Sequence, residues 1–154
     1  GTMKINFSLD YGSWRDLQRH RNTISNKCSV LSEHKIFNKD YYIFLPDILK
    51  NKFDTFIQDQ YKCILKLTKS KEKYISSYYY PLGNFVNAHL VLTFPELIYI
   101  LELRSSKSVH FTLRKLIHQI WNSIKDKYYL QNNYIDESES DFYFNRGNQT
   151  IKEI

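Results

Sequence analysis

Two stretches that alternate between apolar and polar residues constrain the fold of this chain more than any other feature. In residues 4–10, KINFSLD, the apolar side carries Ile5, Phe7 and Leu9. In residues 84–94, NFVNAHLVLTF, the apolar side carries Val86, Ala88, Leu90 and Leu92. A period of two residues is typical of a strand with one buried face, so both stretches are predicted to be strands.

These two strands need at least one more partner, because two strands alone do not make a stable sheet in water. Residues 30–45 are expected to add an irregular strand, KIFNKDYYIF, or a partner chain is expected to contribute one. We expect both contributions.

Helical patterns account for most of the remaining chain. Ser13 and Asp16 form a capping-box pattern, which predicts a helix that begins at Trp14. Apolar residues recur at helical spacing over 46–69, which predicts a long amphipathic helix. Further helices are predicted over 71–79, 95–104 and 108–128. The expected fold class is α+β, a small sheet covered by helices.

Length and composition bound the organisation of the chain. With 154 residues and 42% hydrophobic content, one domain with a core is expected over residues 4–129. Residues 130–154 turn polar and acidic, which predicts a loosely held tail, and residues 1–3 are interpreted as a cloning remnant. No apolar run is long enough to span a membrane, no signal-peptide pattern is present, and the two cysteines fit no metal or disulfide spacing. We therefore expect a cytoplasmic protein without a metal site.

A basic cluster stands near the start of the chain, in YGSWRDLQRHRNTISNKCS. It contains Arg15, Arg19, His20 and Arg21, on what is predicted to be the first turns of a helix. Like charges placed this close repel one another unless an anion lies between them. The cluster is therefore either an anion site or a solvated helix face with Asp16 as its local partner.

The cluster also belongs to a longer pattern. Arg19, His20 and Arg21 are followed by seven residues and then Ser29, which gives RHR-x7-S. A Pro-Leu turn at Pro81 and a Leu-x-Leu-Arg ending at Arg104 follow in order. Over residues 4–128 the chain resembles the flavin-dependent thymidylate synthases, and in particular the C-terminal module of a tandem two-domain member. The resemblance implies the thymidylate synthase-complementing-protein fold, without the N-terminal part that the family normally has.

The function implied by this resemblance is the reductive methylation of dUMP to dTMP. The cofactor would be FAD, with methylenetetrahydrofolate and NADPH as co-substrates. The resemblance assigns Arg19, His20, Arg21 and Asn26 to FAD, and Arg19, Ser29 and Arg104 to dUMP. The implied partners are these small molecules together with a sister domain or further copies of the chain. Neither a membrane nor a nucleic acid is expected.

Several positions depart from the family pattern. Lys27 and Leu31 replace an acidic residue and an arginine that contact dUMP, and Ser77 replaces another nucleotide-binding arginine. Thr93 and Pro95 replace the Asn-x-Arg that holds FAD, and Ser108 replaces a histidine. The alternative is therefore a catalytically degenerate relative that serves as a scaffold or nucleotide-binding module.

Two further interpretations remain open at the level of sequence. His110, Arg114 and His118 recur every four residues on the last predicted helix, either as a ligand-facing ridge or as its solvent-exposed side; the second is favoured. The net charge of +6 and the many tyrosines would also suit a nucleic-acid binder, whose affinity would fall steeply with salt.

Overall fold

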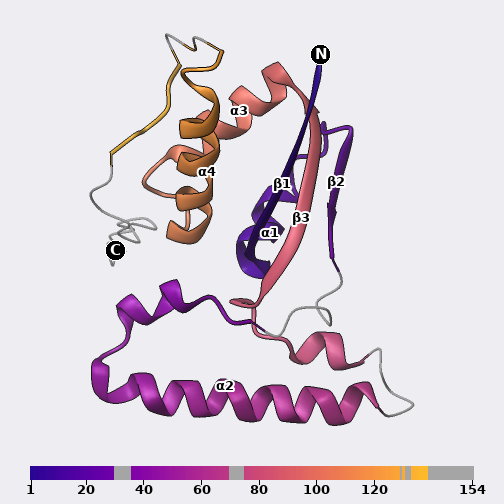
Figure 1. Ribbon diagram of the computed structural model, residues 1–154, viewed down its shortest axis with the longest axis vertical. Coiled ribbons are helices and arrows are strands. Elements are labelled where there is room, and N and C mark those ends of the chain that lie inside the picture. Colours follow the sequence, from indigo (N-terminus) through magenta and orange to yellow (C-terminus); the bar gives the residue numbers. More distant parts are fainter. Residues whose placement is uncertain (30–35, 70–74, 129, 131–132, 139–154) are drawn as a thin grey trace, which may run out of the picture.

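A three-stranded antiparallel sheet forms the centre of the fold (Figure 1). The structure is a computed structural model that describes residues 1–29, 36–69, 75–128, 130 and 133–138. The strands are β1 (Thr2–Asp10), β2 (Ser25–Cys28) and β3 (Phe85–Thr93), in the order β1-β3-β2. β3 pairs along its whole length with β1, from Thr93 opposite Thr2 to Phe85 opposite Asp10. Both strands predicted from alternation are confirmed.

The segment expected to add an irregular strand pairs only at Phe37, which forms an isolated antiparallel bridge with Asn84, and its residues 30–35 lie outside the described residues. Lys39–Phe44 form a 3₁₀ helix, η2. Its N-cap is Asn38, whose side chain accepts a hydrogen bond from the Asp40 N–H at 2.9 Å. The aromatic side chains of η2 pack against other aromatic rings and do not join a sheet. The centroid of the Tyr41 ring, for example, lies 5.4 Å from the centroid of the Phe111 ring. The sheet is completed instead by β2, a short polar strand that lies within the seven-residue spacer of RHR-x7-S and pairs with β3. The chain therefore supplies its third strand itself.

The predicted helices are present, with shifted ends. They are α1 (Tyr11–Leu17), α2 (Asp47–Thr68), η3 (Ile75–Tyr79), α3 (Phe94–Ser105) and α4 (Phe111–Ile124). Within the segment predicted as a helix over 71–79, the described residues form the short 3₁₀ helix η3. α3 begins with a capping box, in which the Glu96 carboxylate accepts from the Thr93 N–H at 2.7 Å.

The first helix begins earlier than predicted and with a different cap. The Asp10 carboxylate accepts a hydrogen bond from the Ser13 backbone N–H at 2.9 Å, so Asp10 is the N-cap. The Ser13 hydroxyl lies inside the protein, where it bonds the Thr112 hydroxyl at 2.6 Å. The predicted capping box of Ser13 and Asp16 is therefore wrong, because the strand leads directly into the helix and a carboxylate one turn earlier reaches the free N–H groups.

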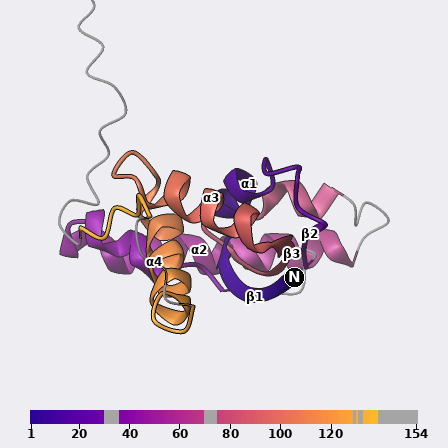
Figure 2. The same cartoon turned by 90° about the horizontal axis from the view of Figure 1, so that it is seen from above.

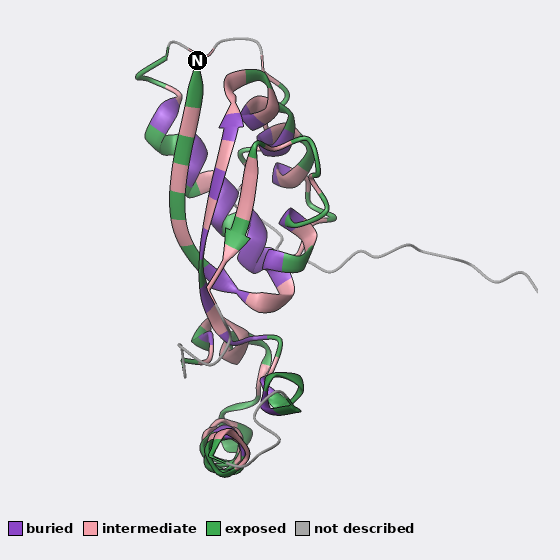
Figure 3. Cartoon of the chain, turned by 90° about the vertical axis from the view of Figure 1, so that its right-hand side faces the viewer, coloured by how far each residue is buried: buried purple, intermediate pink, exposed green. Residues whose placement is uncertain are grey.

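One face of the sheet is covered by helices and the other is polar. The buried core combines alternate residues of β1 and β3 with α1, α3 and α4, including Leu9, Trp14, Leu17, Val86, Leu90, Leu92, Leu97, Leu101, Leu113, Ile117 and Trp121. On the opposite face Lys4, Asn6, Ser8 and Asn87 are exposed. Figure 3 shows this alternation along the strands, and Figure 2 shows how strongly β1 curves. The architecture is the α+β class expected.

α2 lies apart from this body, beyond the end of the sheet opposite the N-terminus (Figures 1 and 3). Its chief neighbour among the described elements is η3. Only Ile57 and Ile64 of its 22 residues are buried. Large apolar side chains such as Ile48 and Phe56 are exposed instead.

Residues 133–138, which follow α4, are held against the body of the protein. Residues 133–138 form hydrogen bonds with α3 and α4, for example from the Asp136 N–H to the Ser105 hydroxyl at 3.0 Å. The prediction of a loosely held tail is therefore wrong for this segment, while residues 139–154 lie outside the described residues. Within the described ranges, no helix combines the length and the apolar character needed to cross a membrane.

Candidate functional site

The arginine-histidine-arginine cluster lies in a turn, not on a helix. α1 ends at Leu17, and the His20 N–H donates to the Leu17 carbonyl at 3.0 Å as the chain turns toward β2. The Thr23 hydroxyl donates back to the His20 carbonyl at 3.1 Å. Of the basic cluster, only Arg15 is on α1, so the prediction of a helical cluster is wrong for Arg19–Arg21. The helix stops here because Leu17 is its last buried residue and β2 must turn back to reach β3.

This turn is joined to the end of α3 through Arg104. Its guanidinium Nε donates to His20 Nε2 at 3.1 Å, and its Nη2 donates to the Asp16 carbonyl at 3.2 Å. The contact spans 84 positions of sequence, yet it joins two residues of the predicted site. His20 must be neutral at Nε2 to accept this bond. Burial, with the nearby Arg104 cation, lowers the pKa of His20 and favours that neutral form.

A hollow of about 530 Å³ lies between this turn and the first turns of α3. Its walls comprise Arg19, His20, Arg21, Asn22, Thr23, Pro95, Glu96, Tyr99 and Ile100. The side chain of Arg19 is 72% exposed and lies 3.6 Å from the Asp16 carboxylate, a weak surface pair. Arg21 is exposed as well. Two guanidinium groups that face open space provide the fork of donors that phosphate and carboxylate oxygens accept.

Tyr99 adds an aromatic surface to this hollow and was missed from the sequence. It is 60% exposed, and its ring lies edge-on to the His20 imidazole with 6.3 Å between centroids. In the segment PELIYILELR, helical spacing places Tyr99 three residues from both Glu96 and Glu102, on the polar side of the helix, and this is the signal that could have indicated it. The hollow thus combines cationic donors with a ring on which a planar group can stack.

A second hollow, of about 370 Å³, lies on the other side of α1. Its walls include Arg15, Asp16, Arg19, Tyr41 and His110. Arg19 therefore borders both hollows. Burial and the adjacent Asp10 carboxylate raise the pKa of Tyr41, so this phenol remains protonated and donates to Asp10 at 3.1 Å.

Asn26 and Ser29 are not among the residues that line either hollow. Asn26 Nδ2 donates to the Leu17 carbonyl at 3.1 Å, which ties β2 to the end of α1. Ser29 continues the strand pairing, because its N–H donates to the Asn87 carbonyl at 2.7 Å and its hydroxyl accepts from the Asn87 N–H at 3.1 Å. The structure thus brings together Arg19, His20, Arg21 and Arg104 but not Asn26 and Ser29.

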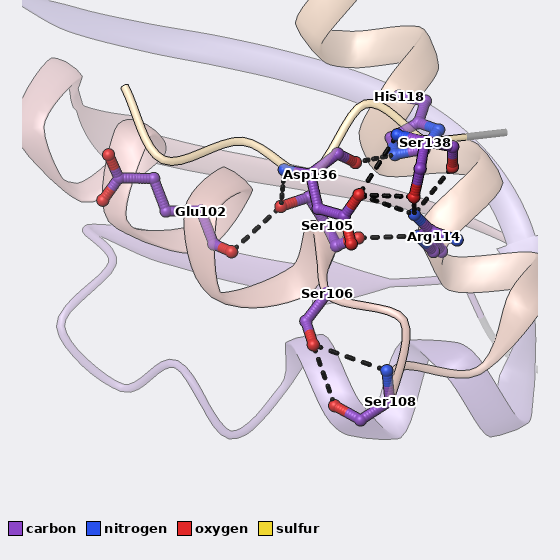
Figure 4. A network of polar contacts seen from close by, with 8 residues as sticks. All are labelled: Glu102, Ser105, Ser106, Ser108, Arg114, His118, Asp136 and Ser138. Carbon is purple, nitrogen blue, oxygen red and sulfur yellow. Dashed lines mark hydrogen bonds and ion pairs between the residues drawn. The ribbon is translucent and has the colours of Figure 1, made fainter. Parts of the chain in front are cut away.

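The ridge of His110, Arg114 and His118 has a third role that the sequence did not indicate. Arg114 has no exposed side-chain surface and is ion-paired with Asp136 at 3.3 Å. His118 Nε2 donates to the Asp136 carbonyl at 2.8 Å. The prediction of a solvent-exposed side is therefore wrong for Arg114: Arg114 and His118 contact the segment after α4 (Figure 4), whereas His110 packs beside Tyr41 and borders the second hollow.

Comparison with known proteins gives a structural likeness without sequence support. No family model matches the chain, and no curated protein matches its sequence. The structure is similar to the crystal structure of PolB, a UMP/dUMP methylase from Streptomyces cacaoi bound with 5-Br dUMP, with a TM-score of 0.66. The likeness covers 81% of this chain and 67% of that one at 11% sequence identity. At that identity it establishes a shared α+β fold, the small antiparallel sheet with its helices that the sequence predicts.

Proposed function

We propose that this chain is a nucleotide-binding module of the flavin-dependent thymidylate synthase type. Assembled with a sister domain or with further copies, it would take part in the reductive methylation of dUMP to dTMP. The observation that carries this proposal is the contact between Arg104 and His20 beside Arg19 and Arg21. These residues come from two separate motifs of the family pattern, and the contact between Arg104 and His20 supports a shared role for them. The likeness to a UMP/dUMP methylase supports the same class of substrate.

The residues of the hollow suit the phosphate groups of a nucleotide or of FAD. Arg19 and Arg21 offer exposed guanidinium donors, and Arg104 on α3 bonds His20, which lies between them in sequence. The Tyr99 ring offers a surface for a base or for another planar ring. Bound FAD would supply the hydride, methylenetetrahydrofolate the carbon unit and NADPH the reducing equivalents. This chain's own residues would hold the anionic groups and orient the rings.

A second candidate is a catalytically degenerate relative, which would serve as a scaffold or nucleotide-binding module without synthase activity. One feature of the same hollow favours it. The Glu96 carboxylate lies in its wall and is engaged by the N–H and hydroxyl of Thr93, at 2.7 and 2.9 Å. Thr93 and Pro95 stand where the family pattern has its FAD-binding Asn-x-Arg. A carboxylate at this helix start repels a phosphate that would otherwise be stabilised there.

Titration calorimetry with dUMP, UMP, FAD and inorganic phosphate tests the proposal. Arg19→Ala and Arg21→Ala should each weaken nucleotide binding by about 1.5–3 kcal/mol, roughly a 10- to 100-fold rise in Kd, for each lost charge-assisted contact. Their thermal stability should stay within about 0.5 kcal/mol of the parent, because both side chains are exposed. Arg104→Ala should weaken dUMP binding similarly.

Lys66→Ala is the matched control, since it removes an exposed cation from α2, away from the hollow. It should bind every ligand as the parent does. Binding of dUMP with saturable flavin absorbance supports the synthase module, whereas dUMP binding without FAD binding supports the degenerate module. If Arg19→Ala and Arg21→Ala bind as tightly as the parent, or the parent binds none of the ligands with its sister domain present, the proposal fails.

A further inference from the structure

The segment of residues 133–138, here called the C-terminal strap, is fastened across the corner between α3 and α4 (Figure 4). The Tyr134 N–H donates to the Glu102 carboxylate at 3.1 Å, and the Asp136 N–H donates to the Ser105 hydroxyl at 3.0 Å. From α4, Trp121 donates its indole N–H to the Glu137 carboxylate. The strap is thus bound to both helices by backbone and side-chain groups.

Arg114 is the centre of this arrangement. Its buried guanidinium donates through Nε to the Ser105 carbonyl at 2.6 Å and through Nη2 to the Ser138 carbonyl at 2.8 Å. The Asp136 carboxylate lies 3.3 Å from Nη2 and is its counter-ion. The hydrogen bond from Ser138, together with the Arg114 cation, lowers the pKa of Asp136 and keeps it ionised. One buried cation therefore joins the strap to the end of α3.

That connection fixes the last turn of α3. The helix ends at Ser105, with Ser106 as its C-cap and no glycine to close it. The final carbonyl groups of a helix have no partner within the helix, and Arg114 supplies one for Ser105. The Ser105 hydroxyl also donates to the Glu102 carbonyl at 3.0 Å. The turn from Glu102 to Ser105 is consequently held from two sides.

Arg104 belongs to this turn and directs its guanidinium at His20 and the Asp16 carbonyl. We infer that Arg114 and the C-terminal strap are a positioning device that sets Arg104 against the arginine-histidine turn. The inference rests on the proposed function only for the ligand that Arg104 would hold. The structural link from the strap through Ser105 to Arg104 and His20 is independent of any ligand.

Three variants test the link. Arg114→Met removes the donors to Ser105 and the strap, Asp136→Ala removes the counter-ion, and Arg114→Lys keeps the charge for partial rescue. Lys115→Met is the matched control, because Lys115 is the next residue of α4 and pairs with Asp40 at 2.8 Å without touching Ser105. Circular dichroism identifies the variants that fold, and Asp136→Ala carries the test if Arg114→Met does not fold.

The first readout is the pKa of His20, which is measured from the NMR signals of its imidazole in a pH titration. The titratable and charged groups around His20 are Asp16 from α1, Glu96, Tyr99 and Arg104 from α3, and Arg19 and Arg21 in its own turn. When Arg104 moves away, the cationic repulsion is lost and the site opens to water, so the pKa should rise toward the ordinary 6.5 in Arg114→Met and Asp136→Ala. It should rise less in Arg114→Lys and stay unchanged in Lys115→Met.

The second readout is dUMP binding by calorimetry, for which we expect a Kd about three- to tenfold higher in Arg114→Met than in the parent. A parent that binds none of the ligands with its sister domain present refutes the proposed function, while the His20 titration still decides the role of the strap. An unchanged His20 pKa in a folded Arg114→Met or Asp136→Ala overturns the inference, as does an equal shift in Lys115→Met.

Discussion

Asp10→Ala separates the helix cap in the structure from the cap that the sequence predicts. The Asp10 side chain is fully buried, and one carboxylate oxygen accepts from both the Ser13 N–H and the Tyr41 hydroxyl. The other carboxylate oxygen is buried without a hydrogen-bond partner within the described part of the chain. The residue thus stabilises α1 and η2 together at some cost in desolvation.

The expected loss follows from these contacts. Removing an N-cap side chain costs about 1 kcal/mol, and leaving the Tyr41 hydroxyl without its acceptor costs about 1–3 kcal/mol more. Asp10→Ala also removes the buried carboxylate oxygen that has no hydrogen-bond partner within the described part of the chain, and the desolvation cost saved offsets part of this loss of stability. We expect the free energy of unfolding to fall by about 1.5–3.5 kcal/mol in Asp10→Ala, and by less than about 1 kcal/mol in Asp10→Asn, which keeps the acceptor.

Urea unfolding, followed by circular dichroism and tryptophan fluorescence, measures both values. Ser13→Ala is the comparison, since it removes only the hydroxyl bond to Thr112 and should cost about 1 kcal/mol. If Ser13→Ala destabilises the protein more than Asp10→Ala does, the cap assigned to Asp10 is wrong.

Gly83→Ala should lower the free energy of unfolding by about 1–3 kcal/mol, because a Cβ at this position would lie 2.5 Å from the Phe37 ring. That ring is packed against Phe53, with 5.3 Å between the ring centroids, so it has little room to move away. An unchanged urea midpoint would contradict this. Lowering the pH from about 7 to about 5 should reduce the free energy of unfolding through His20. Burial and Arg104 lower the pKa of His20 in the folded state, so the folded protein binds its proton less readily than the unfolded chain does. The stability from this difference is present above the ordinary pKa of 6.5 and is lost as the pH falls through the folded-state pKa. His20→Gln should lose this part of the pH dependence, and identical pH profiles for the two proteins would refute it. The exposed apolar residues of α2 predict self-association, seen in sedimentation at micromolar concentration as species larger than 18.6 kDa. Ile48→Lys with Phe56→Glu should give the monomer, and a strictly monomeric parent would count against the prediction.

The elements predicted correctly are those whose side chains face both a core and solvent. β1 and β3 alternate because one face of each is buried, and α4 shows its buried stripe through Leu113, Ile117 and Trp121. β2 shows no such pattern, since SNKC joins the sheet through its backbone at the edge of β3. The aromatic residues of η2 suggested a strand, whereas their rings pack against α2 and α4.

The candidate site was likewise predicted only in part from the sequence. The family resemblance assigns His20 to FAD and Arg104 to dUMP, and the structure shows that the two side chains are in contact, while both assignments stay predictions. Helical periodicity could not show that the turn at Arg19 leaves the helix, because the chain direction there is set by β2 pairing with β3. Arg114 was interpreted as exposed because arginine is rarely buried, and its counter-ion Asp136 becomes a neighbour only when the strap folds back.

The separation of α2 from the sheet has a consequence for amide hydrogen exchange. Segments with few buried contacts open locally, with free energies below that of global unfolding. The amides of α2, which buries only Ile57 and Ile64, should exchange through such local openings together with those of η3. The amides of residues 88–91 in β3, which β1 and β2 flank on both sides, should exchange only when the whole sheet opens. Two exchange classes within one chain would then mark α2 and η3 as a separately unfolding unit.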